Sequence, residues 1–141
     1  MTAKLLYRIA AVILALFAAG HTVGFLSFRP ASAEGLAVYQ AMNSVQFDFQ
    51  GTHYSYGGFY RGFGLMITAY ALFSASLSWH LATLAVSQPH TLRALGWMFV
   101  ILQLAVVILC VVYFFVIPAV LSGVVVICLT GAAWLLGVPR A

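Results

Sequence analysis

The chain has 141 residues, of which 65% are hydrophobic and only 6% are charged. Since an ordinary globular domain is about a quarter charged, this composition argues against a water-soluble domain and predicts an integral membrane protein. Six basic and two acidic residues give a formal net charge of +4, which is too sparse for a nucleic-acid-binding patch, so no nucleic-acid partner is expected.

Four apolar segments predict an all-α bundle of four transmembrane helices in one membrane domain, residues 1–141. A helix needs about 20 apolar residues to cross a hydrocarbon core of ~30 Å. The apolar segment 94–138 would measure ~67 Å as a single helix and must therefore turn. Pro118 is its only interior helix breaker. The predicted spans are residues 5–28, 59–79, 94–115 and 119–138.

The segment 29–58 between the first two spans is the only long polar one. Its apolar residues recur with the spacing of one helical stripe: Val38, Ala41, Met42, Val45 and Phe49. The opposite face carries Gln40, Asn43 and Gln46, and Ser32 is a suitable N-cap. We therefore expect a short amphipathic helix that lies along the membrane surface.

The distribution of cations predicts the orientation of the chain. Lys4, Arg8, Arg93 and Arg140 fall on one side of the spans, whereas Arg29 and Arg61 fall on the other side with Glu34 and Asp48. The positive-inside rule then predicts the orientation of a multi-pass membrane protein. Both termini are expected in the cytoplasm, with the loop 29–58 extracytoplasmic.

Polar residues that lipid contact does not explain gather at this outer end. His21 lies roughly 10 Å inside the predicted boundary of the first span, and ionisable residues at such depth are functional candidates. The catalytic candidates are His21, His53 and Asp48, and the ligand-binding candidates are Met42, Gln46, Tyr54, Tyr56, Tyr60 and Arg61. We expect them to line a hollow for a partly apolar, partly polar molecule.

Each candidate also has a structural interpretation. His21 lies between Gly20 and Gly24 and would then bond a neighbouring helix. Asp48 would pair with Arg61 and hold the loop on the second span, or would instead orient an imidazole for acid–base chemistry. The histidine spacing is not that of a zinc site, so no metal is assigned, and the sequence identifies no cofactor.

Several motifs carry a resemblance to a known group. They are His21-Thr22-Val23-Gly24-Phe25, Met42, Phe47-Asp48-Phe49, Ser55-Tyr56 and Phe59-Tyr60-Arg61-Gly62-Phe63-Gly64. Together they resemble a group of small uncharacterised bacterial four-helix integral membrane proteins, over most of the chain. The resemblance implies four helices, an outward motif loop and a location in the bacterial inner (cytoplasmic) membrane, and it supplies no activity to transfer. In size and layout the chain is also loosely similar to DoxX-like membrane proteins.

Two functions follow as hypotheses. In the first, the chain binds or transforms a lipophilic small molecule, lipid or quinone-like, that enters from the outer leaflet. In the second, it is a non-catalytic subunit or a homo-oligomer without a small-molecule site. Gly123, Gly131, Ala132 and Ala133 of the fourth span would then permit close contact between helices. Membrane lipids are partners under both hypotheses.

Overall fold

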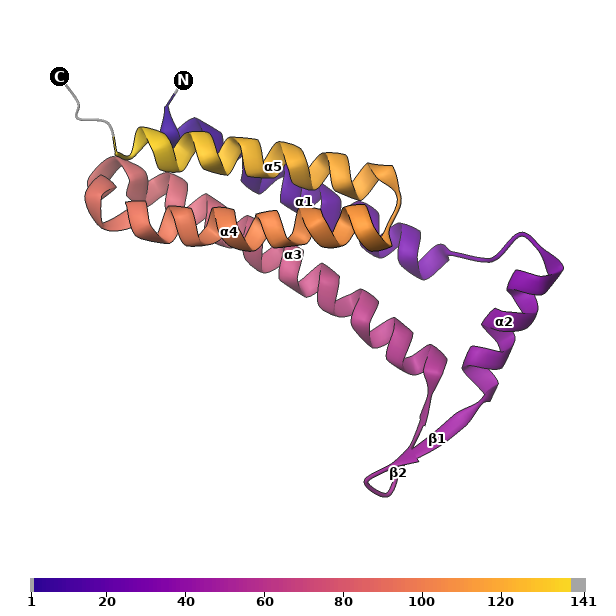
Figure 1. Cartoon of the computed structure of the whole chain (residues 1–141). Helices are drawn as coiled ribbons and strands as arrows, with labels where there is room; N and C mark the ends of the chain where they lie inside the picture. The colour runs from indigo at the N-terminus through magenta and orange to yellow at the C-terminus, as the bar shows by residue number, and fades with distance from the viewer. Residues whose placement is uncertain (1, 138–141) are drawn as a thin grey trace. The chain divides into compact units, whose positions relative to one another are not determined.

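The structure, a computed structural model, describes residues 2–137, apart from the side chains of residues 89 and 90. It confirms a largely helical chain with four helices long and apolar enough to cross a membrane (Figure 1). These are α1 (Ala3–Ser27), α3 (Tyr56–Ser87), α4 (Pro89–Tyr113) and α5 (Val116–Leu135). The end of the predicted fourth span at residue 138, and Arg140, lie outside the described residues.

The second span is much longer than the predicted segment 59–79. Helix α3 has 32 residues and would measure about 48 Å, which exceeds the ~30 Å core of a bilayer. It continues to Ser87, so that Gln88 alone separates it from α4. Proline occupies the first turn of α4, where its missing N–H costs no helical hydrogen bond. The polar residues near 88 therefore start a helix instead of forming a loop.

The turn between α4 and α5 falls earlier than Pro118 suggests. Helix α4 ends at Tyr113 and α5 begins at Val116, so the predicted start of the last span at residue 119 was wrong. Pro118 lies in the first turn of α5. Backbone N–H groups in a first turn have no helical acceptor, so proline is tolerated there and does not end the helix.

The polar segment contains a helix and a hairpin. Helix α2 (Ala33–Ser44) begins as predicted, because the Ser32 side chain accepts a hydrogen bond from the Gly35 N–H at 3.0 Å. It ends at Ser44, so the prediction that its stripe continues to Phe49 was wrong. Strands β1 (Gln46–Phe49) and β2 (Thr52–Ser55) pair antiparallel instead.

A tight turn at Gln50-Gly51 joins the two strands, where the helical stripe was expected to end. Gln50 and Gly51 both have positive φ angles, 51° and 78°. A two-residue turn with two positive φ angles matches the right-handed twist of paired strands. Two alternating aromatic segments around Gln50-Gly51 were thus a readable hairpin signal, which the 3.6-residue spacing of the apolar stripe concealed.

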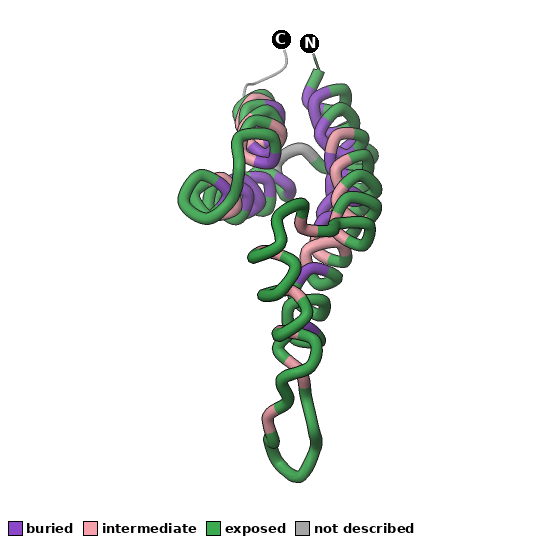
Figure 2. Tube along the Cα trace, turned by 90° about the vertical axis from the view of Figure 1, so that its right-hand side faces the viewer, coloured by how far each residue is buried: buried purple, intermediate pink, exposed green. Residues whose placement is uncertain are grey.

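The chain forms two compact units, each of which is described by itself. Unit 1 comprises Met1–Phe17 and Ala71–Ala141, and unit 2 comprises Ala18–Tyr70. Buried residues concentrate on the helices of unit 1, whereas α2 and the hairpin of unit 2 are exposed or partly buried (Figure 2). Helices α4 and α5 lie side by side within unit 1 (Figure 1).

The core of unit 1 is built largely from small residues, while large apolar residues point outward. Alanines from α1, α3 and α5 are buried: Ala3, Ala10, Ala82, Ala85, Ala132 and Ala133. Met98, Ile101 and Ile127 are each about two-thirds exposed or more (66%, 67% and 72%). This distribution suits a bilayer, because helices in lipid associate through close packing of small residues. Since Ala132 and Ala133 are 0% exposed, they are not available as the predicted oligomer face.

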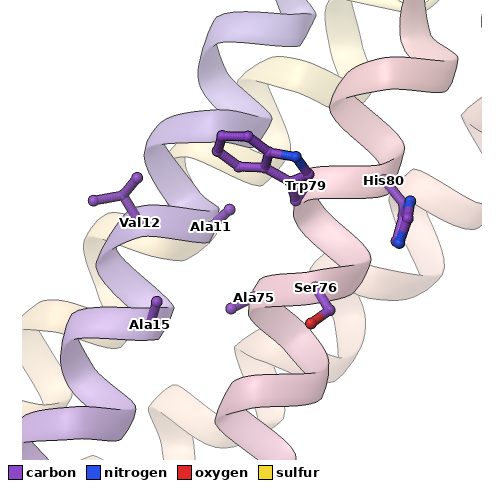
Figure 3. Close-up of a pocket in the computed structure, with 7 residues that line it drawn as sticks. All are labelled: Ala11, Val12, Ala15, Ala75, Ser76, Trp79 and His80. Carbon is purple, nitrogen blue, oxygen red and sulfur yellow. The ribbon is translucent and has the colours of Figure 1, made fainter.

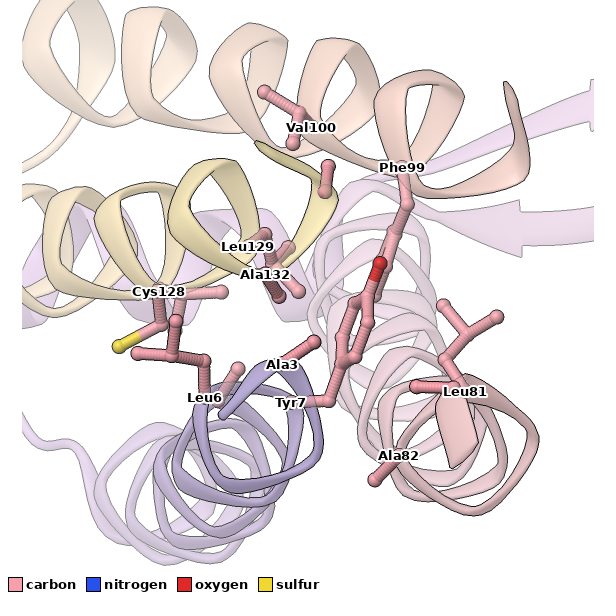
Figure 4. Close-up of a cluster of buried hydrophobic side chains, with 14 of the residues drawn as sticks. Ala3, Leu6, Tyr7, Leu81, Ala82, Phe99, Val100, Cys128, Leu129 and Ala132 are labelled. Atoms are coloured by element: carbon pink, nitrogen blue, oxygen red, sulfur yellow. The ribbon is translucent and has the colours of Figure 1, made fainter. Parts of the chain in front are cut away.

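Tyr7 is the large side chain around which unit 1 packs. It is 0% exposed and reaches from α1 towards Phe99 of α4 (Figure 4). The Ser78 hydroxyl of α3 donates a hydrogen bond to the Tyr7 carbonyl at 2.7 Å. Gly96 of α4 leaves room for the phenol, since a Cβ atom there would lie 2.6 Å from the Tyr7 hydroxyl oxygen and 3.3 Å from the Ala133 Cβ of α5.

We expect Gly96→Ala to lower the free energy of unfolding by about 1–3 kcal/mol, because the added methyl overpacks the contact between Tyr7 and Ala133. Gly123→Ala is the matched control, since a Cβ atom at Gly123 meets nothing within 4 Å. There the better helix propensity of alanine should leave stability unchanged or slightly raised. Thermal unfolding of both variants in the same detergent measures the difference, and equal melting temperatures would contradict the packing described.

Candidate functional site

All the candidate residues belong to unit 2, but the structure distributes them over separate groups. Met42, Gln46 and the other seven candidates fall within Ala18–Tyr70. The hairpin holds one group, the α1–α3 contact a second, and the α2–α3 contact a third.

Asp48 and His53 form the polar pair of the hairpin. They are directly opposite each other in the strand register, and the Asp48 carboxylate accepts a hydrogen bond from His53 Nδ1. A carboxylate can orient an imidazole in this way for acid–base catalysis. Here, however, the side chains are 73% and 72% exposed, for His53 and Asp48 respectively. Solvent screens such a pair, which typically contributes no more than about 1 kcal/mol.

The predicted ion pair between Asp48 and Arg61 was wrong. The register of the hairpin places Asp48 opposite His53. Arg61 instead donates a hydrogen bond from its Nη2 atom to Asn43 Oδ1 of α2, at 3.4 Å. The loop is therefore joined to α3 through an amide and not through a carboxylate.

An aromatic cluster packs the hairpin on the start of α3. Phe47 is its centre, with ring centroids 6.1 Å from Tyr54, 4.9 Å from Tyr56 and 5.5 Å from Phe59. Phe59 also contacts Phe63 at 6.1 Å. Tyr54 and Tyr56, predicted as ligand-binding residues, thus pack against Phe47, although they remain 40% and 53% exposed.

His21 joins α1 to α3 within unit 2. Its Nε2 atom lies 3.0 Å from the Gly64 carbonyl oxygen, and since a carbonyl only accepts, Nε2 carries the proton. The imidazole stacks on Phe25 at 5.6 Å, and Phe25 contacts Tyr60 at 5.3 Å. One turn along α3, the Thr68 hydroxyl bonds the Thr22 hydroxyl at 2.8 Å. These contacts match the structural interpretation of His21, a hydrogen bond to a neighbouring helix.

The third group borders a groove between α2 and α3. Tyr39, Gln40, Asn43 and Ser44 line one side of this groove of about 450 Å³, and Arg61 lines the other. Gly57 allows the close approach, because a Cβ atom there would lie 2.5 Å from Asn43 Oδ1 and 3.1 Å from the Met42 carbonyl oxygen. The groove therefore combines amide and hydroxyl groups with one guanidinium.

Two groove residues are newly identified by the structure. Gln40 and Asn43 are on the predicted polar face of α2, but Tyr39 and Ser44 carried no recognisable signal. A second guanidinium adjoins the groove, since Arg29 lies over the Tyr39 ring at 5.8 Å. Gln46, a predicted ligand residue, is the first residue of β1 and does not line the groove.

Residues 2–137, the part of the chain that the structure describes, contain no cluster of side chains suited to a metal ion. No three His, Cys, Asp or Glu side chains of this part of the chain gather as a metal site would require.

No protein-family model, curated protein or solved structure matches this chain. What it binds therefore has to be inferred from its own residues.

Gly64→Ala should weaken the contact between α1 and α3 in unit 2. A Cβ atom at Gly64 would collide with the Phe25 ring, which also stacks on His21. We expect a loss of about 1–3 kcal/mol in the free energy of unfolding, as is typical of overpacking. Faster amide hydrogen exchange in residues 18–27 would report the loosened contact. Gly62→Ala is the control, because its Cβ atom meets nothing within 4 Å; equal exchange in both variants would refute the packing.

Proposed function

We propose that the chain is a multi-pass protein of the bacterial inner membrane whose unit 2 binds a lipophilic small molecule with an anionic head group. The site is the α2–α3 groove, on the extracytoplasmic side. The observation that carries this proposal is the environment of Arg61, which faces amide and hydroxyl groups and is hydrogen-bonded to Asn43 instead of the expected carboxylate.

The chemistry of the groove suits a phosphate or a carboxylate. A guanidinium offers a planar fork of donors that matches such groups, and charge-assisted hydrogen bonds are about twice as strong as neutral ones. Gln40 offers an amide donor, whereas the Asn43 amide and the Ser44 hydroxyl already donate to the carbonyl oxygens of Tyr39 and Ala41. Arg29, stacked over Tyr39, adds a second positive charge nearby. A quinone-like ring would not require this cation, so an acidic lipid-like molecule is the better fit.

The surrounding aromatic residues support a site at the boundary between membrane and water. Phe59, Tyr60 and Phe63 on α3 remain 47%, 50% and 59% exposed. Aromatic side chains concentrate at the level of the lipid head groups. At that level the apolar part of a ligand remains in the hydrocarbon while its head group reaches Arg61.

Binding is favoured over catalysis because none of the three predicted acid–base groups lines the groove. Asp48 and His53 pair with each other on the exposed hairpin, and His21 is engaged between α1 and α3. Among the candidate residues, only Arg61 lines the groove.

The outward placement of unit 2 rests on the cation count. Lys4, Arg8 and Arg93 would be cytoplasmic together with both termini, as the positive-inside rule expects. Arg140, which contributes to the same count, lies outside the described residues.

Native mass spectrometry of the chain released from mild detergent tests the proposal. We expect a bound acidic amphiphile in the wild type that Arg61→Gln weakens about tenfold or more, since a hydrogen bond to a charged group contributes about 1.5–3 kcal/mol. Arg93→Gln removes the same charge from unit 1 and should leave the occupancy unchanged. A defined oligomer that carries no small molecule would instead favour the subunit hypothesis and refute this one.

A further inference from the structure

A second groove lies on unit 1, between α1 and α3 (Figure 3). Small residues form its floor, and a large aromatic residue stands at one end. It is bordered by Ala11 and Ala15 of α1 and by Ala75, Ser76, Trp79 and His80 of α3. The groove is shallow and measures about 370 Å³. Ala15, Ser76 and Trp79 are exposed, so the groove is open from the side.

Cations and small residues follow one face of α1 along this groove. Lys4, Arg8, Ala11 and Ala15 recur at intervals of three or four residues, which places them on one stripe of the helix. The stripe is about 16 Å long. Its end near the N-terminus is positively charged, and its remainder is apolar and shallow.

Arg8 is held at the groove by Trp79. Its guanidinium carbon lies 4.9 Å from the centroid of the Trp79 ring, within the range of a cation–π contact. Such a contact orients the guanidinium and leaves its hydrogen-bond donors available to an anion. His80, on the next residue of α3, offers a further donor at the same end.

Unit 1 has no carboxylate side chain that could neutralise these cations. The two acidic residues of the sequence, Glu34 and Asp48, both belong to unit 2. Arg29 and Arg61 also belong to unit 2, so four of the six basic residues fall in unit 1. Lys4 and Arg8 therefore have no acidic side chain within this unit with which to pair.

From this juxtaposition of a charged mouth and an apolar floor, we propose that the α1–α3 groove of unit 1 binds an anionic phospholipid. Lys4 and Arg8 would contact the phosphate, and an acyl chain would lie along Ala11, Ala15 and Ala75. Basic pockets between transmembrane helices recognise anionic head groups in this way. The site is distinct from the α2–α3 groove and uses none of its residues.

Charge also distinguishes the lipid from a second copy of the chain as the occupant. In a symmetric dimer the same surface lies on both sides of the interface. Lys4 and Arg8 of one copy would then approach Lys4 and Arg8 of the other, with no carboxylate in either unit 1 to separate them. An anionic lipid meets the same surface with the opposite charge.

Lipid titration of the full-length protein in neutral detergent tests the inference, with dioleoylphosphatidylglycerol as the anionic probe and dioleoylphosphatidylcholine as the neutral one. We expect the anionic lipid to bind at least tenfold more tightly by native mass spectrometry. Arg8→Gln and Lys4→Gln should each weaken it about fivefold, the usual contribution of one basic residue near a lipid surface. Ala15→Leu should also weaken it, because the larger side chain fills the groove without any change in charge.

Two controls separate a built site from diffuse attraction. Arg93→Gln removes an exposed cation of unit 1 that packs against Gly137 and lies on α4, not on either helix of the groove. It should leave binding unchanged, as should Arg61→Gln in the α2–α3 groove. An equal loss with Arg93→Gln and Arg8→Gln, or no effect of Ala15→Leu, would overturn the inference. So would a dimer that Ala15→Leu dissociates.

Because the two grooves share no residue, this inference and the proposed function fail independently. Loss of the bound amphiphile in Arg61→Gln together with normal phosphatidylglycerol binding would locate that amphiphile in unit 2. The reverse pattern in Arg8→Gln would locate phospholipid binding in unit 1.

Discussion

Tyr7 is where the four helices of unit 1 converge. A helix in hydrocarbon gains nothing from hiding apolar surface, so its neighbours must hold it through close packing and a few hydrogen bonds. The Tyr7 ring fills the space that Gly96 leaves on α4, beside Ala133 of α5, and its carbonyl accepts the Ser78 hydroxyl of α3. The alanines of the same core are buried and allow the helices to pack closely. This constraint also explains why large apolar residues remain outside, where lipid would contact them.

The two units divide the charge of the chain unequally. Unit 1 has cations without acidic partners, whereas unit 2 holds both acidic residues and two arginines. In unit 2 the Asp48 carboxylate pairs with His53 and does not neutralise Arg61. The Arg61 guanidinium bonds the neutral amide of Asn43 and keeps its positive charge uncompensated by that contact. Each unit thus presents guanidinium groups beside a groove. We have proposed an anionic amphiphile as the ligand of each groove for this shared reason.

The hairpin decides which residues of unit 2 meet. Its alternation places Phe47 and Tyr54 on one face and Asp48 and His53 on the other. The first pair packs on Phe59 of α3, while the second remains exposed. Because side chains in a strand alternate between the two faces, a shift of one residue would exchange these roles. The turn at Gln50-Gly51 prevents that shift and so keeps Asp48 away from Arg61.

The sequence was sufficient to predict the four apolar spans and the N-cap at Ser32, since hydrophobicity and capping depend on residues close together in the chain. The same reasoning extended α2 too far and placed the turn between the last two helices at Pro118. Strand pairing ends α2, and Pro118 is tolerated because it lies in the first turn of α5. The candidate residues His21, Asp48 and Arg61 were recognised by type, but the sequence left their partners open. Asp48 could pair with Arg61 or orient His53 or His21, and His21 could bond an unspecified neighbouring helix. Only the tertiary structure decided that His21 bonds the Gly64 carbonyl, that Asp48 bonds His53 and that Arg61 borders a groove. These contacts join residues distant in the chain, and their geometry follows from strand register and helix packing, which no single segment contains.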